Sequence, residues 1–187
     1  MGQLQDSYLE LYRSTALFRI YSSTLVPGLL QTEGYAGGIL HTSASLHDVP
    51  GDDSVQAARA RVERSRIIHE PGHRLVAVIE EAALRHQVCD PDAMAAQLGY
   101  LLTAGALPQV SVGIVPLALA SRRQWPRETF HVYDDRLVSV ELVSARVRIT
   151  QPDEIALYLK AFEQLRGAAV YGAEARTLIA QAIDALH

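Results

Sequence analysis

Acidic side chains placed within or directly after apolar runs are the residues of this sequence best suited to chemistry. Glu81 closely follows the apolar run 75–79, and Glu141 stands among the valines and leucines of the run 137–142. A carboxylate at the end of a buried strand is a recurrent position for acid–base chemistry or for anchoring a ligand. Glu81 can equally start the following helix and pair with Arg85 four residues later. The sequence leaves both interpretations of Glu81 open.

His131 is a third candidate for chemistry. In the run 130–133, apolar residues alternate with His131 and Tyr133, so one pair faces the core and the other faces away from it or into a cavity. If the protein is an enzyme, Glu81, Glu141 and His131 are the candidates for proton transfer.

The pair Pro27-Gly28 predicts a corner between the extended run 19–26 and a helix that begins near Leu29. Proline fixes its own φ and disfavours helix in the residue before it, and glycine permits a tight turn. The helix then carries Gln31 and Tyr35 one turn apart on one face. That arrangement fits the wall of a pocket, and it equally fits a half-buried helix with a solvated edge.

Two arginines and the only tryptophan could contact a ligand or a partner. Arg61 and Arg64 lie in the predicted helix 55–68, where they either form a solvated basic face or bind an anionic group. Trp125 lies beside two arginines in the loop 118–127, where it suits a lid or a partner contact, or packs beneath the loop. The candidate ligand-binding residues are therefore Gln31, Tyr35, Arg61, Arg64, Glu81, Trp125 and Glu141.

The hydrophobic periodicity predicts an α+β fold. Helices are expected at 4–19, 29–42, 55–68, 82–86, 90–105, 151–166 and 173–186, and strands at 19–26, 75–79, 110–116, 130–133, 137–142 and 147–150. We expect a single domain over residues 1–187, built as a mixed β-sheet with helices packed around it. Residues 1–24 would form a connector helix and the first strand.

Composition narrows the classes of function. The sequence is 49% hydrophobic and 20% charged, as in globular proteins, and it contains no apolar run long enough to cross a membrane and no export signal. A net charge of -4 argues against direct nucleic-acid binding. Cys89 is the only cysteine and the seven histidines lack ligand spacing, so we expect no metal, no cofactor and a cytoplasmic location.

The segment 25–36, LVPGLLQTEGYA, resembles the signature of a C-terminal domain found in antitoxin-like transcriptional regulators of actinobacteria. Further similar segments follow at 61–64, 78–85, 112–116 and 138–142. Those regulators carry an N-terminal helix-turn-helix of the XRE type. The helices that read DNA are missing from this sequence, so it stays open whether Met1 is the natural start.

The resemblance implies a regulatory domain that binds a small molecule or a partner protein. Gln31, Tyr35, Glu81 and Glu141 would then lie near one apolar cavity and supply its polar groups. One alternative is a stand-alone enzyme of secondary-metabolite biosynthesis on the same scaffold, using glutamate and histidine acid–base chemistry. Another is a structural partner that pairs with full-length regulators. The sequence fixes neither the ligand nor the oligomeric state, and a homodimer is compatible with it.

Overall fold

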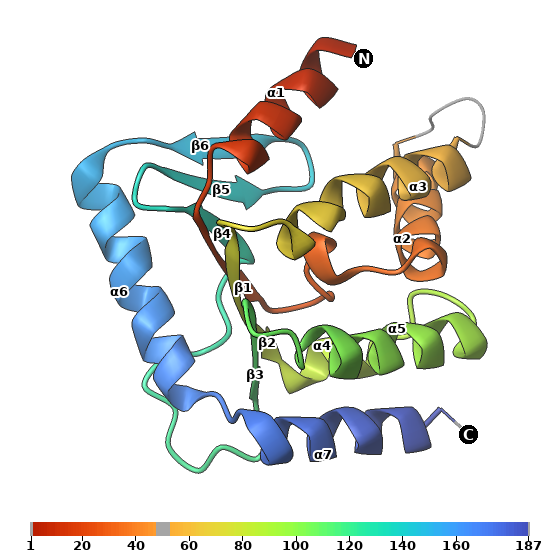
Figure 1. Cartoon of the computed structure of the whole chain (residues 1–187). Coiled ribbons are helices and arrows are strands. Elements are labelled where there is room, and N and C mark those ends of the chain that lie inside the picture. The colour runs from red at the N-terminus through yellow and green to blue at the C-terminus, as the bar shows by residue number, and fades with distance from the viewer. Residues whose placement is uncertain (1, 48–52, 187) are drawn as a thin grey trace.

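The computed structural model describes residues 2–47 and 53–186. Its helices pack around one mixed sheet, which confirms the expected α+β class (Figure 1). The helices are α1 Gly2–Arg13, α2 Glu33–Leu46, α3 Ser54–Ser65, α4 Glu81–Arg85, α5 Pro91–Ala104, α6 Pro152–Ala168 and α7 Gly172–Asp184, with 3₁₀ helices η1 Gly28–Leu30 and η2 Arg66–His69. The strands are β1 Leu17–Ser22, β2 Arg74–Glu80, β3 Val110–Val115, β4 Phe130–Tyr133, β5 Leu137–Glu141 and β6 Arg146–Ile149.

The strands form one mixed sheet in the order β3-β2-β1-β4-β5-β6. Strands β1, β2 and β3 are parallel to one another, whereas β4, β5 and β6 continue the sheet from β1 as an antiparallel meander. The sheet therefore has a parallel half and an antiparallel half, which confirms the predicted mixed sheet. Among the described residues, no helix combines the length and the apolar character needed to cross a membrane.

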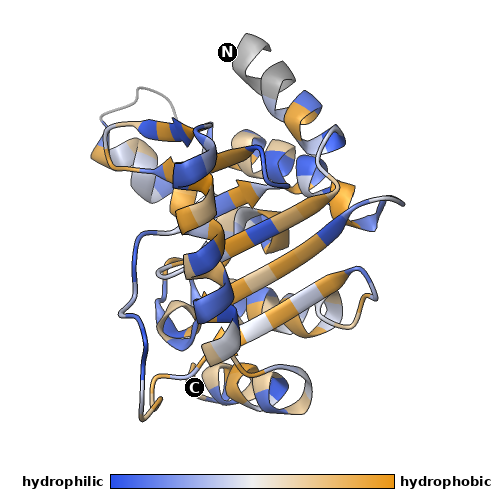
Figure 2. Ribbon diagram, turned by 90° about the vertical axis from the view of Figure 1, so that its left-hand side faces the viewer, coloured by the Kyte–Doolittle hydropathy of each residue, from blue (hydrophilic) through white to orange (hydrophobic). Residues whose placement is uncertain are grey.

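Helices cover the two faces of the sheet unequally. Helix α6 packs on one face, and η1, α4, α5 and α7 pack on the other (Figures 1 and 2). Because successive side chains of a strand point to opposite faces, each strand contributes to both cores. On the α6 side, Ile155, Phe162 and Leu165 meet the strands, and each buried side chain contributes about 1.5–3 kcal/mol.

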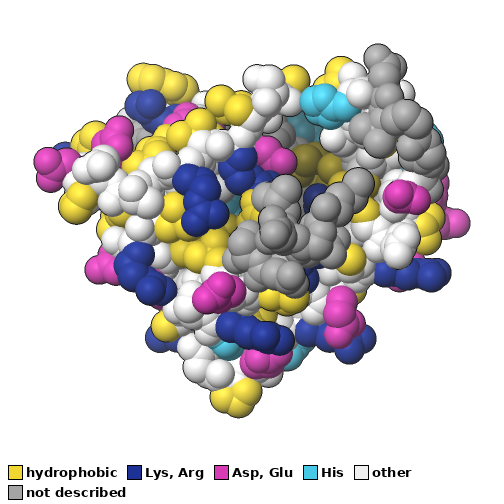
Figure 3. Space-filling model, turned by 90° about the horizontal axis from the view of Figure 1, so that it is seen from above, with side chains coloured by type: hydrophobic (Ala, Val, Ile, Leu, Met, Phe, Trp, Pro, Cys, Tyr) yellow, Lys and Arg dark blue, Asp and Glu magenta, His cyan; other side chains and the backbone are white. Residues whose placement is uncertain are grey.

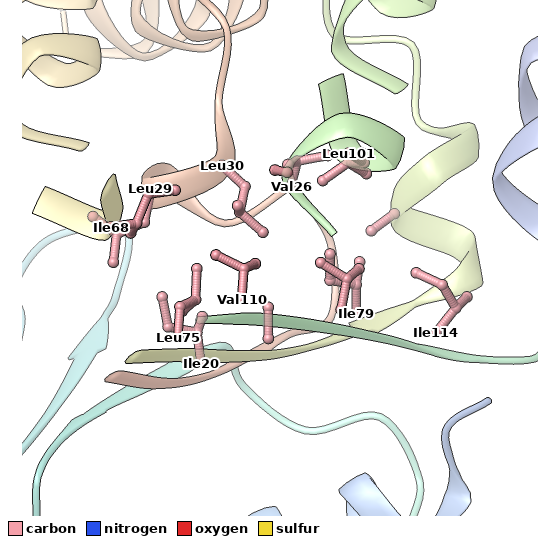
Figure 4. Close-up of a cluster of buried hydrophobic side chains, with 14 of the residues drawn as sticks. Ile20, Val26, Leu29, Leu30, Ile68, Leu75, Ile79, Leu101, Val110 and Ile114 are labelled. Carbon is pink, nitrogen blue, oxygen red and sulfur yellow. The ribbon is translucent and has the colours of Figure 1, made fainter. Parts of the chain in front are cut away.

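The larger core lies on the opposite face and fixes the position of the Pro27-Gly28 corner. Side chains of β1, β2 and β3 point toward η1 and α5 (Figure 4). The strands contribute Ile20, Leu75, Ile79, Val110 and Ile114, and the covering elements contribute Val26, Leu29, Leu30, Ile68 and Leu101.

Two predicted helix boundaries were wrong. The first helix ends at Arg13 and not at residue 19, because the Ser14 and Thr15 hydroxyls donate to the carbonyl of Leu11 at 3.0 and 2.7 Å. After the corner, the chain forms only the single turn η1. Gln31 then returns to an extended conformation, so α2 begins at Glu33.

Asp134, in the hairpin between β4 and β5, binds the backbone at the start of β1. Asp134, at φ 55, occupies the turn between β4 and β5, where aspartate is one of the residues that tolerate this conformation. Its Oδ1 accepts from the backbone N–H groups of Ala16 and Leu17 at 3.0 and 2.8 Å. The turn between β4 and β5 thus also holds the joint between α1 and β1.

Two adjacent glycines of α2 provide a matched test of the packing between α2 and residues 88–89. A Cβ at Gly38 would lie 2.5 Å from the carbonyl oxygen of Val88, whereas a Cβ at Gly37 would meet nothing within 4 Å. We expect Gly38→Ala to destabilise the protein by about 1–3 kcal/mol, because backbone must move to admit the methyl group. Gly37→Ala should stabilise it by up to about 1 kcal/mol through helix propensity. Urea unfolding of both variants measures this, and equal effects would contradict the packing.

Candidate functional site

The Pro27-Gly28 corner is held by buried side chains that bind its backbone. The amide of Gln31, 5% exposed, donates from Nε2 to the carbonyl of Val26 at 2.8 Å. The hydroxyl of Tyr35, 0% exposed, accepts from the N–H of Val26 at 3.1 Å. A buried backbone group without a hydrogen-bond partner destabilises the fold. Gln31 and Tyr35 therefore stabilise the corner by binding the C=O and the N–H of Val26.

A third side chain, which the sequence analysis missed, completes this network. Gln97 of α5 is fully buried, donates from Nε2 to the carbonyl of Leu30 at 2.7 Å and accepts on Oε1 from the N–H of Thr32 at 2.8 Å. The sequence could have indicated this residue, because Gln97 shares the apolar face of its helix with Met94, Leu98 and Leu101. A buried polar side chain on such a face needs hydrogen-bond partners.

The prediction that Gln31 and Tyr35 share one face of a single helix was wrong. Gln31 follows η1 in an extended conformation, and Tyr35 lies inside α2. Both side chains bind the backbone of Val26, which lies between β1 and η1. Tyr35 is therefore a structural residue, whereas Gln31 still has an oxygen that bonds outward.

That outward bond connects the corner to Arg61. The Nη1 of Arg61, on α3, donates to the Oε1 of Gln31 at 2.9 Å. Burial lowers the pKa of Arg61, the negative charge of Glu141 raises it, and the positive charge of Arg64 lowers it. Within the described residues, no carboxylate lies within 4.0 Å of the Arg61 guanidinium.

Arg61 faces the antiparallel half of the sheet. On the side of the sheet opposite α6, strand register aligns His131 with Ser139 and Ser139 with Arg148, and it pairs Glu141 with Arg146. We call these five residues and Tyr133 the polar face, because they alternate with the buried residues that meet α6.

His131 is a member of the polar face whose pKa is strongly shifted by its surroundings. Burial, followed by the positive charge of Arg61, lowers the pKa of its imidazole to about 4. One of the two alternating pairs was predicted to face away from the core or into a cavity. Phe130 and Val132 lie in the core on the α6 side, and Tyr133 is buried in the larger core, so within the other pair only His131 is partly exposed. The structure thus brings Arg61, His131 and Glu141 to one place.

A row of aromatic rings borders the polar face on the side of α1. Tyr133 stacks on Tyr12 with ring centroids 6.2 Å apart, and His131 lies 6.3 Å from Tyr133. Tyr8 meets Tyr12 at 6.3 Å, and the guanidinium of Arg146 lies 4.9 Å from the Tyr8 ring. Burial raises the pKa of the Tyr12 hydroxyl, while the charges of Arg64 and Arg61 oppose that rise. Helix α1 therefore contacts the polar face, and the charges of Arg61 and Arg64 on α3 act on its residues and on Tyr12.

Glu81 does not share this site. Its carboxylate accepts from Arg85 at 2.9 Å and from the N–H of Leu117 at 2.9 Å. The ends of β2 and β5 are three strands apart in the sheet, or roughly 14 Å at ordinary strand spacing. Glu81 and Glu141 thus do not lie beside each other as expected, and the predicted Glu81–Arg85 pair is formed.

The neighbouring acid, Glu80, is the buried carboxylate that the sequence analysis did not choose. It is 2% exposed, accepts a hydrogen bond from the Tyr21 hydroxyl at 2.8 Å and forms a two-point ion pair with Arg122. Arg122 belongs to the segment between β3 and β4, so this contact fastens that long connection to the sheet. The sequence could have indicated this position, because side chains alternate along β2 and Glu80 therefore points to the α6 side, as Val76 and Val78 do.

Trp125 lies in the same connection and is 67% exposed, with the guanidinium of Arg127 4.6 Å from its ring. It does not pack beneath the loop, so that alternative was wrong. Among the described residues, Trp125 forms no hydrogen bond with the polar face. Within the residues described, no three histidine, cysteine or acidic side chains converge as metal ligands would.

The fold and the site define a class: an α+β domain whose antiparallel half carries an arginine-rich polar face between two helices. The family model described as "Domain of unknown function (DUF5753)" matches residues 5–181. The chain therefore belongs to this family, and the match covers nearly all of it. The comparison with curated proteins found no match.

The lowered pKa of His131 predicts a pH dependence of stability. An unfolded chain would bind the His131 proton with a pKa near 6.5, so between about pH 4 and 6.5 it takes up more protons than the folded protein. The free energy of unfolding should therefore fall as pH is lowered through this range, by up to about 2–3 kcal/mol, and stay unaffected by this group above it. His131→Gln should remove this component in urea titrations. His69→Gln, which changes an exposed histidine, should retain it, and an unchanged slope in His131→Gln would refute the assignment.

The buried Glu80–Arg122 pair predicts a second stability effect. Glu80→Gln removes the charge that compensates Arg122, and we expect a loss of about 2 kcal/mol or more because the guanidinium keeps a partly buried charge. Glu63→Gln breaks an exposed pair with Arg66 and should cost less than about 0.5 kcal/mol. Thermal and urea unfolding of both variants compares them. Similar losses in the two variants would show that Glu80 is no more important than a surface acid.

Proposed function

We propose that this domain is a regulatory binding module that takes a small molecule between α1, α3 and the antiparallel half of the sheet. The observation that carries the proposal is the state of Arg61. It is desolvated, it is oriented by Gln31, and within the described residues it lacks an ion-pair partner. A fixed guanidinium beside aromatic rings supplies the few oriented polar groups that small-molecule sites have.

The regulatory part of the proposal rests on the similarity of segment 25–36 and the later segments to actinobacterial regulators of the XRE type. In such a protein, a domain of this kind would follow a helix-turn-helix and respond to a signal. Helix α1 is the element that would connect the two parts, and its Tyr12 stacks on Tyr133 of the polar face. Occupation of the site could thus be transmitted to a preceding segment through α1. A partner protein at the same surface is the second form that the signal could take.

The enzyme alternative draws less support from the site. Its three proton-transfer candidates are divided, because the Glu81 carboxylate is held by Arg85 and Leu117 while His131 and Glu141 lie on the polar face. The side chain of Glu141 is 75% exposed and pairs with Arg146 at 3.4 Å. We therefore favour binding without turnover.

The test is a thermal-shift screen of the purified chain against neutral, cationic and anionic small molecules. We expect at least one chemical class to raise the midpoint of unfolding by several degrees, because a ligand that binds only the folded state stabilises it. The compounds should be recovered unchanged by mass spectrometry. Arg61→Met should abolish the shift, and Arg59→Met, which changes the exposed partner of Glu33, should preserve it. Stabilisation that survives Arg61→Met, or chemical conversion of the ligand, would contradict the proposal.

A further inference from the structure

The arginines of α3 and the adjoining Arg66 of η2 fall into two groups according to their partners. Arg59 pairs with Glu33 at 2.8 Å, and Arg66 pairs with Glu63 at 3.2 Å, both on the exposed side of the helix. Arg61 and Arg64 are only partly exposed, and in the described structure neither has a carboxylate within 4.0 Å. Because residues three apart share a helix face, these two unpaired arginines point in similar directions.

Strand β6 adds two more arginines to the same surface. Arg146 and Arg148 alternate with Val147 and therefore lie on one side of the strand, the side of the polar face. Burial lowers the pKa of Arg146, and the positive charge of Arg148 lowers it further. Arg148 has no hydrogen-bond or ion-pair partner among the described residues.

Four arginines thus lie on α3 and on the β6 part of the polar face, with one carboxylate near two of them. We call Arg61, Arg64, Arg146 and Arg148 the arginine cluster, and Glu141 is the acid that acts on Arg61 and pairs with Arg146. The whole chain carries a net charge of -4, so this local excess of positive charge is opposite to that of the molecule. Like charges held together destabilise a fold unless an anion compensates them. Figure 3 shows basic side chains and acidic ones gathered beside a hollow with hydrophobic side chains in its floor.

The rings at this surface suit a planar ligand body. Tyr8, Tyr12, Tyr133 and His131 form a continuous row of ring contacts at 6.2–6.3 Å. His131 and Tyr12 are only partly buried, so an incoming ring can reach the edge of this row. Aromatic side chains bind flat apolar groups, and guanidinium groups bind oxyanions. The two features together favour a compound that has both an aromatic ring and an oxyanion.

We propose that the arginine cluster is an anion site, and that the ligand is a small aromatic molecule bearing a carboxylate or phosphate group. The oxyanion would lie among Arg61, Arg64 and Arg148, and the ring would lie against the tyrosine row. This inference rests on the proposed function and adds the chemical class of the ligand. Carboxylate and phosphate share the geometry that a guanidinium recognises, and the experiment below separates them.

The experiment is a calorimetric and NMR titration of the whole chain with benzoate, phenyl phosphate and benzamide, the last being a neutral analogue of benzoate. We expect at least one anionic probe to bind about tenfold or more tightly than benzamide, with an affinity that falls as sodium chloride is raised. Tighter binding of phenyl phosphate assigns the site to phosphates, and tighter binding of benzoate assigns it to carboxylates. Either result supports the inference.

Variants locate the binding. Arg148→Met and Arg61→Met should each weaken the anionic probe about tenfold or more. Arg59→Met in α3 and Arg66→Met in η2, which remove the two paired arginines, should leave it within about twofold. Arg148 lies on an exposed edge strand without a described partner, so its variant stays informative if Arg61→Met does not fold.

Three results would overturn the inference: benzamide binding as tightly as the anions, Arg148→Met binding like the wild type, or Arg59→Met weakening binding as much as Arg148→Met. Stabilisation by a neutral compound in the thermal-shift screen, together with no preference for anions here, would remove the anion site and leave the binding function intact. No binding in either experiment would remove both.

Discussion

The structure depends on the need to satisfy buried backbone groups at the Pro27-Gly28 corner. The chain turns there inside the core, where its N–H and C=O groups cannot reach water. Gln31, Tyr35 and Gln97 supply the missing hydrogen bonds, and each comes from a different element or joint. Because Gln31 uses its nitrogen inward and its oxygen outward, the same corner that closes the core also orients Arg61.

This coupling brings Arg61 to the candidate site, which lies on the antiparallel half of the sheet. The parallel half is covered on both faces by helices, and its side chains are almost entirely apolar. The antiparallel half is covered fully only by α6, so its other face can carry His131, Ser139 and Glu141. Helices α1 and α3 border that face without filling it with apolar side chains. The arginines of α3 therefore meet a polar surface and not a hydrophobic one.

Glu80 and Glu141 lie in different electrostatic surroundings. Glu80 is buried with Arg122 and Tyr21, and its contacts tie the connection between β3 and β4 to the sheet. Glu141 is exposed and lies among more positive charges than it can neutralise. A paired buried carboxylate is a structural device, whereas an excess of like charge beside aromatic rings is a state that a ligand can relieve.

The sequence by itself determined the α+β class, the mixed sheet, the strand positions and the corner, because period-two and helical patterns and the Pro-Gly pair are local signals. It also singled out Arg61, His131 and Glu141, since polar residues in apolar or helical surroundings stand out in a sequence. Only the tertiary structure decided that these three residues meet, that Glu81 lies apart, and that Gln97 and Glu80 are the buried polar residues that matter. The reason is physical: strand order and the partners of a buried amide are set by contacts between residues far apart in the chain, and no local pattern contains them.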